Sequence, residues 1–306
     1  MSRLPYQTVR RLATRPAGIT PAQERVLRVV HRYHLLAASQ VQQLLYADSC
    51  LRYARQQVST LAKAGYLQPI LMPNHARTGS APVIYTLARK GRQHLAAAGI
   101  AVPRRLRPAK TRQYDYLHLT HAKEANQLLI LGERLVRVTD RVQLVAVRCE
   151  HDLRRQPARV RLPDGSSTSV TPDGWLNLIE RGGDGRRYAT ALAFEHDRGS
   201  EHVTAWRRKV RALLAWAQGP YHDLFGTTAV TIVVVAGTGE ARRQQLITWT
   251  EIELQAAGMT AAADLFRFVA GHPDHLTPQT LFLAPIAYRP LDPSPRPLLE
   301  VAGEVA

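Results

Sequence analysis

Three carboxylates stand at the ends of strand-like runs in the second half of the 306-residue chain. Asp173 comes directly before the run GWLNLIE, and Glu195 and Asp197 close the run ALAFEHD. Side chains two residues apart on a strand share a face, so Glu195 and Asp197 are expected to point the same way. Carboxylates that meet at a sheet edge suit Mg²⁺ or Mn²⁺, and such an ion activates water and stabilises charge on a phosphate. The pattern predicts Asp173 and Glu195 as metal ligands, with Asp197 as a third catalytic acid.

Two further residues could complete such a site from neighbouring helices. Lys209 lies on an amphipathic helix expected over residues 202–218, and its ammonium group would position water and offset charge on the phosphate. Glu124, on a long helix expected over residues 113–138, would be a further acid near the ion. A different interpretation has no ion and pairs the carboxylates with strand-end amides and with arginines that are near in sequence: Arg198, Arg207 and Arg208.

The elements that carry these residues alternate between helix and strand. After the helix at 113–138, the hydrophobic pattern predicts helices at 202–218 and 239–258. The run TAVTIVVVAG is continuously apolar, as expected of a strand buried on both faces. The order predicts an α/β domain with a mixed central sheet over residues 112–290 and a Pro-rich extended tail at 291–306. The expected strands cover residues 142–153, 159–180 as a hairpin, 188–197, 228–237, 265–271 and 276–286.

Charge is divided very unevenly along the chain. The net charge of +17 comes from 41 Lys and Arg against 24 Asp and Glu. Residues 1–115 hold 19 of the basic residues and only three acids, whereas residues 116–306 are almost neutral. A GC-rich genome can explain arginine in place of lysine, but it does not explain the near absence of acids. The positive first part therefore predicts a polyanionic partner, and we expect double-stranded DNA.

Residues 1–105 are expected to form a basic arm and a small helical domain. Thr20 and Pro21 are typical of a helix start, a second short helix follows, and a third ends at Gly65. This third helix has an apolar face and a polar face that contains no acid. Arginine can bond guanine at two positions, and glutamine can do the same for adenine, so the polar face is predicted to read DNA. Its residues are Arg52, Arg55, Gln56, Ser59 and Lys63.

A hairpin is expected directly after the third helix. Its strands are YLQPIL and PVIYTLARKG, and the loop between them contains Arg77. Three helices and a hairpin are typical of a winged helix-turn-helix, in which the third helix enters the major groove and the loop reaches the flanking backbone. Winged helices also serve as protein-interaction modules, an alternative that the charge of this part disfavours. A Pro-rich basic linker at 99–112 is expected to end the domain.

The motifs of both halves resemble those of known families. Pro172-Asp173, followed by Glu195 in an α-β-β-β-α-β order, resembles the PD-(D/E)xK nuclease superfamily. That motif expects a lysine two residues after the glutamate, where this chain has Asp197, so Lys209 would act as a migrated lysine. The GYL and YTLARKG segments resemble bacterial winged-helix regulators. With TPDGW, FEHDRGSE and WRRKVRAL, nearly the whole chain resembles the replication-relaxation family of plasmids and integrative elements.

This resemblance implies a DNA-binding accessory protein of plasmid replication or conjugative mobilisation. Its nuclease-like domain would be degenerate and serve as a scaffold, with a relaxase or a replication protein as a partner. Binding as a homodimer to a palindromic site is a further expectation. An active Mg²⁺-dependent endonuclease and a winged-helix transcription regulator are the alternatives, and Mg²⁺ is expected only for the active nuclease.

Other classes of protein are disfavoured by the residues. The two cysteines are far apart and form no CxxC motif, which disfavours a disulfide scaffold and a cysteine zinc site. Two histidine pairs, His118 with His121 and His272 with His275, offer two zinc ligands each and are expected to be ordinary surface or core histidines. The longest apolar stretch is too short to cross a bilayer, so a cytoplasmic protein without membrane contact is expected.

Overall fold

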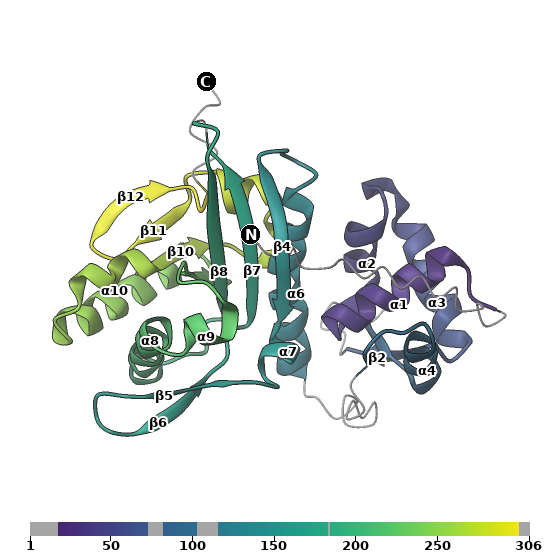
Figure 1. The fold of residues 1–306 in the computed structure, drawn as a ribbon, viewed down its shortest axis with the longest axis horizontal. Coiled ribbons are helices and arrows are strands. Elements are labelled where there is room, and N and C mark those ends of the chain that lie inside the picture. The colour runs from purple at the N-terminus through teal and green to yellow at the C-terminus, as the bar shows by residue number, and fades with distance from the viewer. Residues whose placement is uncertain (1–17, 73–81, 103–115, 183, 300–306) are drawn as a thin grey trace, which may run out of the picture. The chain divides into compact units, whose positions relative to one another are not determined.

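The computed structural model describes residues 18–72, 82–102, 116–182 and 184–299. The chain divides into two compact units, Met1–Tyr114 and Asp115–Ala306, and both contain helices and strands (Figure 1). The fold is therefore mixed α/β, as predicted. None of the helices in the described part has the length and apolar character needed to span a bilayer.

The first unit combines helices with a small antiparallel sheet. Its helix α1 begins where the sequence predicts, because Pro21 is the first helical residue and the Gln23 amide donates to Thr20 Oγ1 at 3.3 Å. The strands pair in the order β1-β3-β2. The helices are α1 (Pro21–Tyr33), α2 (Ala38–Leu45), α3 (Leu51–Lys63) and α4 (Arg89–Ala97), and the strands are β1 (Leu36–Ala37), β2 (Leu67–Leu71) and β3 (Val83–Leu87).

The second unit is built on a seven-stranded mixed sheet in the order β12-β11-β10-β9-β8-β7-β4. The strands β4, β7 and β8 form an antiparallel meander, and β9 and β10 run parallel to β8. A separate hairpin, β5 (Ala158–Arg161) with β6 (Ser167–Val170), lies between β4 and β7 in the chain. The sheet strands are β4 (Val142–Cys149), β7 (Gly174–Arg181), β8 (Arg187–Asp197), β9 (Thr231–Ala236), β10 (Phe266–Ala270), β11 (Ala287–Arg289) and β12 (Asp292–Arg296).

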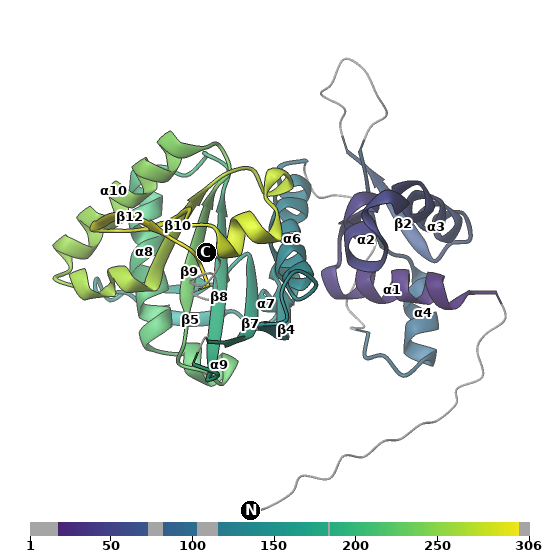
Figure 2. The same cartoon turned by 90° about the horizontal axis from the view of Figure 1, so that it is seen from above.

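Helices cover both faces of this sheet (Figures 1 and 2). Helix α6 (Tyr116–Leu135) lies on one face, and α8 (Val203–Gln218) and α10 (Glu240–Ala256) lie on the other. Two glycines allow α6 to approach β7 closely: a Cβ at Gly132 would lie 2.3 Å from Leu176 Cδ1, and one at Gly174 would lie 2.8 Å from Leu129 Cδ2. This packing holds α6 beside the start of β7. Two short helices complete the unit, α7 (Glu150–Leu153) and α9 (Tyr221–Phe225).

The C-terminal part differs from the prediction in two places. Residues 276–286, expected as a strand, contain a π-helical turn at Gln279–Leu283, and this turn packs beside α6. Thr277 favours the turn because its hydroxyl accepts from the Thr280 amide at 3.1 Å. The sheet also continues past the predicted domain end at residue 290. Strand β12 lies in the expected extended tail and pairs with β11 at the sheet edge, where prolines are tolerated.

Candidate functional site

The solvent-facing side of α3 in the first unit is basic and free of acids. The opposite side of the helix buries Ala54, Val58 and Leu61 in the core. Within the described residues, no carboxylate forms an ion pair with the basic groups of the outer side. The residues of this α3 face are Arg52, Arg55, Gln56 and Lys63, which are exposed, and Ser59, which is half-buried. The predicted wing residue Arg77 lies outside the described residues.

A cleft with a volume of ≈ 590 Å³ opens in the second unit where β8 ends and β7 begins. Two of the predicted carboxylates, Asp173 and Glu195, line it together with Lys209. His121 from α6 and Glu150 from α7 also line it, and the other charged residues of its wall are Arg154, Asp197, Arg198 and Glu201. The cleft thus collects titratable groups from both faces of the sheet.

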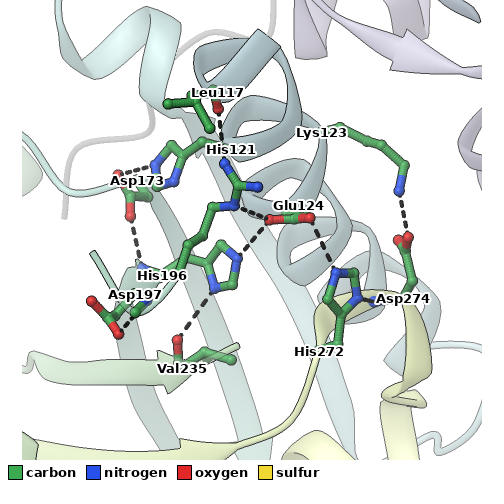
Figure 3. A network of polar contacts seen from close by, with 12 residues as sticks. Leu117, His121, Lys123, Glu124, Asp173, His196, Asp197, Val235, His272 and Asp274 are labelled. Carbon is green, nitrogen blue, oxygen red and sulfur yellow. Dashed lines mark hydrogen bonds and ion pairs between the residues drawn. The ribbon is translucent and has the colours of Figure 1, made fainter. Parts of the chain in front are cut away.

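Asp173 is held by hydrogen bonds to both of its carboxylate oxygens. His121 Nε2 lies 2.9 Å from Oδ1, and the His196 amide donates to Oδ2 at 2.7 Å (Figure 3). Burial alone would raise the pKa of Asp173, but the hydrogen bond and charge of His121, the charge of Lys209 and the His196 amide lower it to about 2. For His121 the directions are reversed: burial alone would lower its pKa, but Asp173 raises it to about 9. The two side chains form a partly buried ion pair, with 24% of the His121 side chain and 11% of the Asp173 side chain exposed.

Lys209 reaches the acids from helix α8. Its Nζ lies 2.9 Å from Glu195 Oε2 and 2.7 Å from Glu201 Oε1. Burial would lower the pKa of Lys209, but Glu195, Asp173 and Glu201 together raise it, so the ammonium group stays charged. Burial raises the pKa of Glu195, Lys209 opposes this rise, and the charge of Asp173 adds to it. The structure therefore brings together Asp173, Glu195 and Lys209, which the sequence placed in one site.

Asp197 belongs to a different interaction although it also borders the cleft. Arg242 of α10 binds both carboxylate oxygens, with Nε 2.7 Å from Oδ2 and Nη2 3.0 Å from Oδ1, and the Gly199 amide donates to Oδ2 at 2.9 Å. Burial would raise the pKa of Asp197, but these hydrogen bonds and the charge of Arg242 lower it. The arginine neutralises Asp197, so its arrangement does not support the predicted role of a third catalytic acid.

Two of the three arginines expected to balance the cleft pair with other acids. Arg198 Nε lies 3.1 Å from Glu124 Oε2, and Arg207 Nε lies 2.7 Å from Glu253 Oε2. Arg211 binds the same Glu253 at 3.0 Å. Asp197 does have an arginine partner, as predicted, but the arginine is a different one. It is Arg242, which comes from α10, the helix that packs beside α8.

Glu124 does not line the cleft, but it contacts two residues that do, His196 and Arg198. Its carboxylate is 3.0 Å from His196 Nε2 and 3.1 Å from His272 Nε2 (Figure 3). Burial would raise the pKa of Glu124, but the hydrogen bond to His196 and the nearby cationic groups lower it. Together with the Lys123–Asp274 ion pair, this network ties the segment after β10 to α6. The expectation that Glu124 lies beside the ion is therefore not supported.

His121 and Glu150 line the cleft but were not predicted from sequence as members of the site. His121 was expected to be an ordinary histidine, and Glu150 falls in the stretch 142–153 that was predicted as a strand, whereas β4 ends at Cys149 and Glu150 begins α7. One ligand atom each from His121, Glu150 and Asp173 lies within 4.8 Å of the others. One imidazole nitrogen and two carboxylate oxygens are a donor set that fits a divalent cation.

These two units define the class of protein: a mixed α/β chain with an acid-free basic helix in one unit and a carboxylate cleft in the other. A family model described as replication-relaxation matches residues 27–231, more than half of the chain. The protein belongs to the replication-relaxation family, as its motifs predicted, which indicates a role in plasmid replication or relaxation. No curated protein and no solved structure matches the chain.

Proposed function

We propose that the protein is a double-stranded DNA-binding accessory factor of a mobile element, acting in plasmid replication or conjugative mobilisation. The observation that carries this proposal is the α3 face, whose arginines, lysine and glutamine face solvent with no acid among them. Arginine and glutamine in such positions can each make paired hydrogen bonds to base edges in the major groove. The charge of the surrounding unit supplies attraction to phosphates.

The elements of the first unit support a winged helix-turn-helix. Helices α1, α2 and α3 are followed by the antiparallel pair β2 and β3, with β1 as a third strand. In that class of protein the third helix enters the major groove and dimers read palindromic sites. We therefore propose that α3 is the recognition helix and that two copies bind one palindrome.

The second unit supports a nuclease-like scaffold. Its elements α6, β4, β7, β8, α8 and β9 follow the helix-strand-strand-strand-helix-strand order of the PD-(D/E)xK resemblance, with the β5–β6 hairpin inserted. Asp197 stands where that motif expects a lysine. Its Oδ2 accepts a hydrogen bond from Arg242 Nε at 2.7 Å. This substitution favours a degenerate domain that binds a relaxase or a replication protein of the same element.

The proposal is tested by the triple variant Arg52→Ala, Arg55→Ala and Gln56→Ala. Preferred duplexes are first selected from a randomised library with the wild-type chain, and affinities for selected and scrambled duplexes are then compared by gel-shift competition. We expect the variant to bind both duplexes equally and weakly, because base contacts are lost while phosphate contacts remain. Each lost bidentate contact corresponds to about 1–3 kcal/mol of discrimination.

A matched control removes the same kinds of side chain from elsewhere in this unit. Arg25, Arg89 and Gln93 are exposed on α1 and α4, outside the α3 face. Their triple alanine variant should weaken binding to both duplexes by a similar factor and keep the preference. Equal discrimination by the wild-type chain and the α3 variant would contradict the assignment of α3 as the recognition helix.

A second candidate, a metal-dependent DNA endonuclease, is favoured by one contact. Lys209 Nζ lies 2.9 Å from Glu195, so a migrated lysine is within reach of the acids. This candidate predicts cleavage with Mg²⁺ or Mn²⁺ that disappears in Glu195→Gln and Lys209→Met, measured on supercoiled, linear and single-stranded DNA. No cleavage of any of these forms would exclude it.

A further inference from the structure

We propose that the cleft binds one divalent transition-metal ion, with Mn²⁺ as its probe, through His121, Glu150 and Asp173. The ion would lie on the α6 and α7 side of Asp173. It would not lie between Asp173 and Glu195, where the sequence motif places it. This ion site is in the second unit and does not involve the α3 face, so ion binding can be measured without DNA.

The geometry brings the three side chains together from three separate elements. His121 lies on the first turns of α6, Glu150 begins α7, and Asp173 precedes β7. Their ligand atoms lie within 4.8 Å of one another. Small side-chain rotations would place all three at ~2.0–2.2 Å from a common ion, the distance between metal and ligand that such ions require. The His121 ring stacks on His196, with centroids 5.8 Å apart, which orients the ring.

The charges of this group favour a cation. Asp173 and Glu150 are both buried, with 8% of each residue exposed. Arg154 pairs with Glu150 at 2.5 Å, and His121 pairs with Asp173 at 2.9 Å. A divalent ion among the three ligands would carry the positive charge that balances the two carboxylates.

Glu195 is less suited to hold the ion. The half-buried Lys209 has its Nζ 2.9 Å from Glu195 Oε2 and 2.7 Å from Glu201 Oε1. A cation beside Glu195 would have to approach this ammonium group. Glu150 also has a cationic partner, Arg154, but the side chain of Arg154 is 58% exposed, against 34% for Lys209, so Arg154 can turn to solvent more easily when an ion binds.

The donor set also predicts which ions bind. The imidazole nitrogen favours ions such as Zn²⁺ and Co²⁺, and the two carboxylates suit Mn²⁺, whereas Mg²⁺ and Ca²⁺ prefer oxygen ligands alone. Three protein ligands leave coordination positions open towards the cleft. Those positions could take water or a phosphate oxygen.

The test uses the full chain without a histidine tag. Mn²⁺ is titrated, free Mn²⁺ is counted by electron paramagnetic resonance, and spin-echo modulation reports on nitrogen bound to the ion. We expect one Mn²⁺ per chain with a nitrogen signal, and weaker competition by Mg²⁺ and Ca²⁺. His121→Ala and Glu150→Gln should each weaken Mn²⁺ binding by about tenfold or more. Glu195→Gln should change it by less than about twofold.

His118→Ala is the matched control, because His118 lies on the same helix one turn earlier and should leave the nitrogen signal intact. His121→Asp protects the test against misfolding, since it keeps a charged ligand for an ion but removes the nitrogen signal. No bound Mn²⁺, a signal without nitrogen in the wild-type chain, or a loss of binding in Glu195→Gln but not in Glu150→Gln would overturn the proposal.

Discussion

Two carboxylates on the same strand show how their surroundings decide their chemistry. Glu195 and Asp197 lie two residues apart near the end of β8, and both have cationic partners from helices on the same face of the sheet. Glu195 meets a lysine with one oxygen, whereas both oxygens of Asp197 accept from a guanidinium. An arginine fork fixes a carboxylate in place more rigidly than a lysine does. Glu195 therefore stays part of the cleft, and Asp197 becomes a structural anchor.

Removal of Arg242 should destabilise the second unit. The Arg242 and Asp197 side chains are 10% and 2% exposed, so Arg242→Ala leaves a buried carboxylate without its partner. We expect a loss of about 3–5 kcal/mol in the free energy of unfolding. Urea denaturation followed by tryptophan fluorescence measures this unit alone, because all four tryptophans lie after residue 115. Arg186→Ala, which removes an ion pair whose arginine side chain is 80% exposed, is the control and should cost about 0–1 kcal/mol.

The same pair determines a dependence on acid. The folded-state pKa of Asp197 is below its ordinary value of 3.8, so the contribution of the pair is complete above that pH and is lost as the pH falls. Asp197→Asn should therefore flatten the fall in stability of the second unit below about pH 4. An unchanged acid profile in this variant would show that the pair does not set the response.

At the scale of elements, features that depend on residues close together in the sequence were predicted better than features that depend on packing between distant segments. The Thr20 cap, the two faces of α3 and the buried strand β9 are short-range features, and the structure has all three. The mixed sheet followed from the alternation of helix and strand. The π-helical turn at Gln279–Leu283 was missed because a short apolar run does not distinguish a strand from a buried helical turn.

The residues of the cleft that were not predicted from sequence are brought there by contacts between segments far apart in the chain. The pattern of strand ends placed Asp173 and Glu195 together, and Lys209 was inferred from the helix that follows. Arg242 is 45 positions from Asp197, and nothing in its own segment indicates that α10 presents it to β8. His121 was not predicted as a ligand because its pair with His118 offers only two ligands and the sequence shows no third or fourth. The acids that it meets come from α7 and the start of β7.

At the scale of the whole molecule, the two units have different charges. Residues 1–115 hold 19 basic residues and three acids, whereas the rest of the chain is nearly balanced. In the second unit the basic groups Arg207, Lys209, Arg211 and Arg242 pair with carboxylates, but the α3 face has no acid to pair with. This distribution supports nucleic-acid contact through the first unit, in keeping with the replication-relaxation family.

The most direct measurement is the affinity of the full chain for a labelled duplex, by fluorescence anisotropy, over a series of salt concentrations. Binding should be tight at low salt, and its logarithm should fall linearly with the logarithm of salt concentration, with a slope of about −0.9 for each phosphate contacted. The α3 triple variant should bind more weakly and show a shallower slope. A wild-type chain that does not bind the duplex at low salt, or binds it with no dependence on salt, would contradict the account.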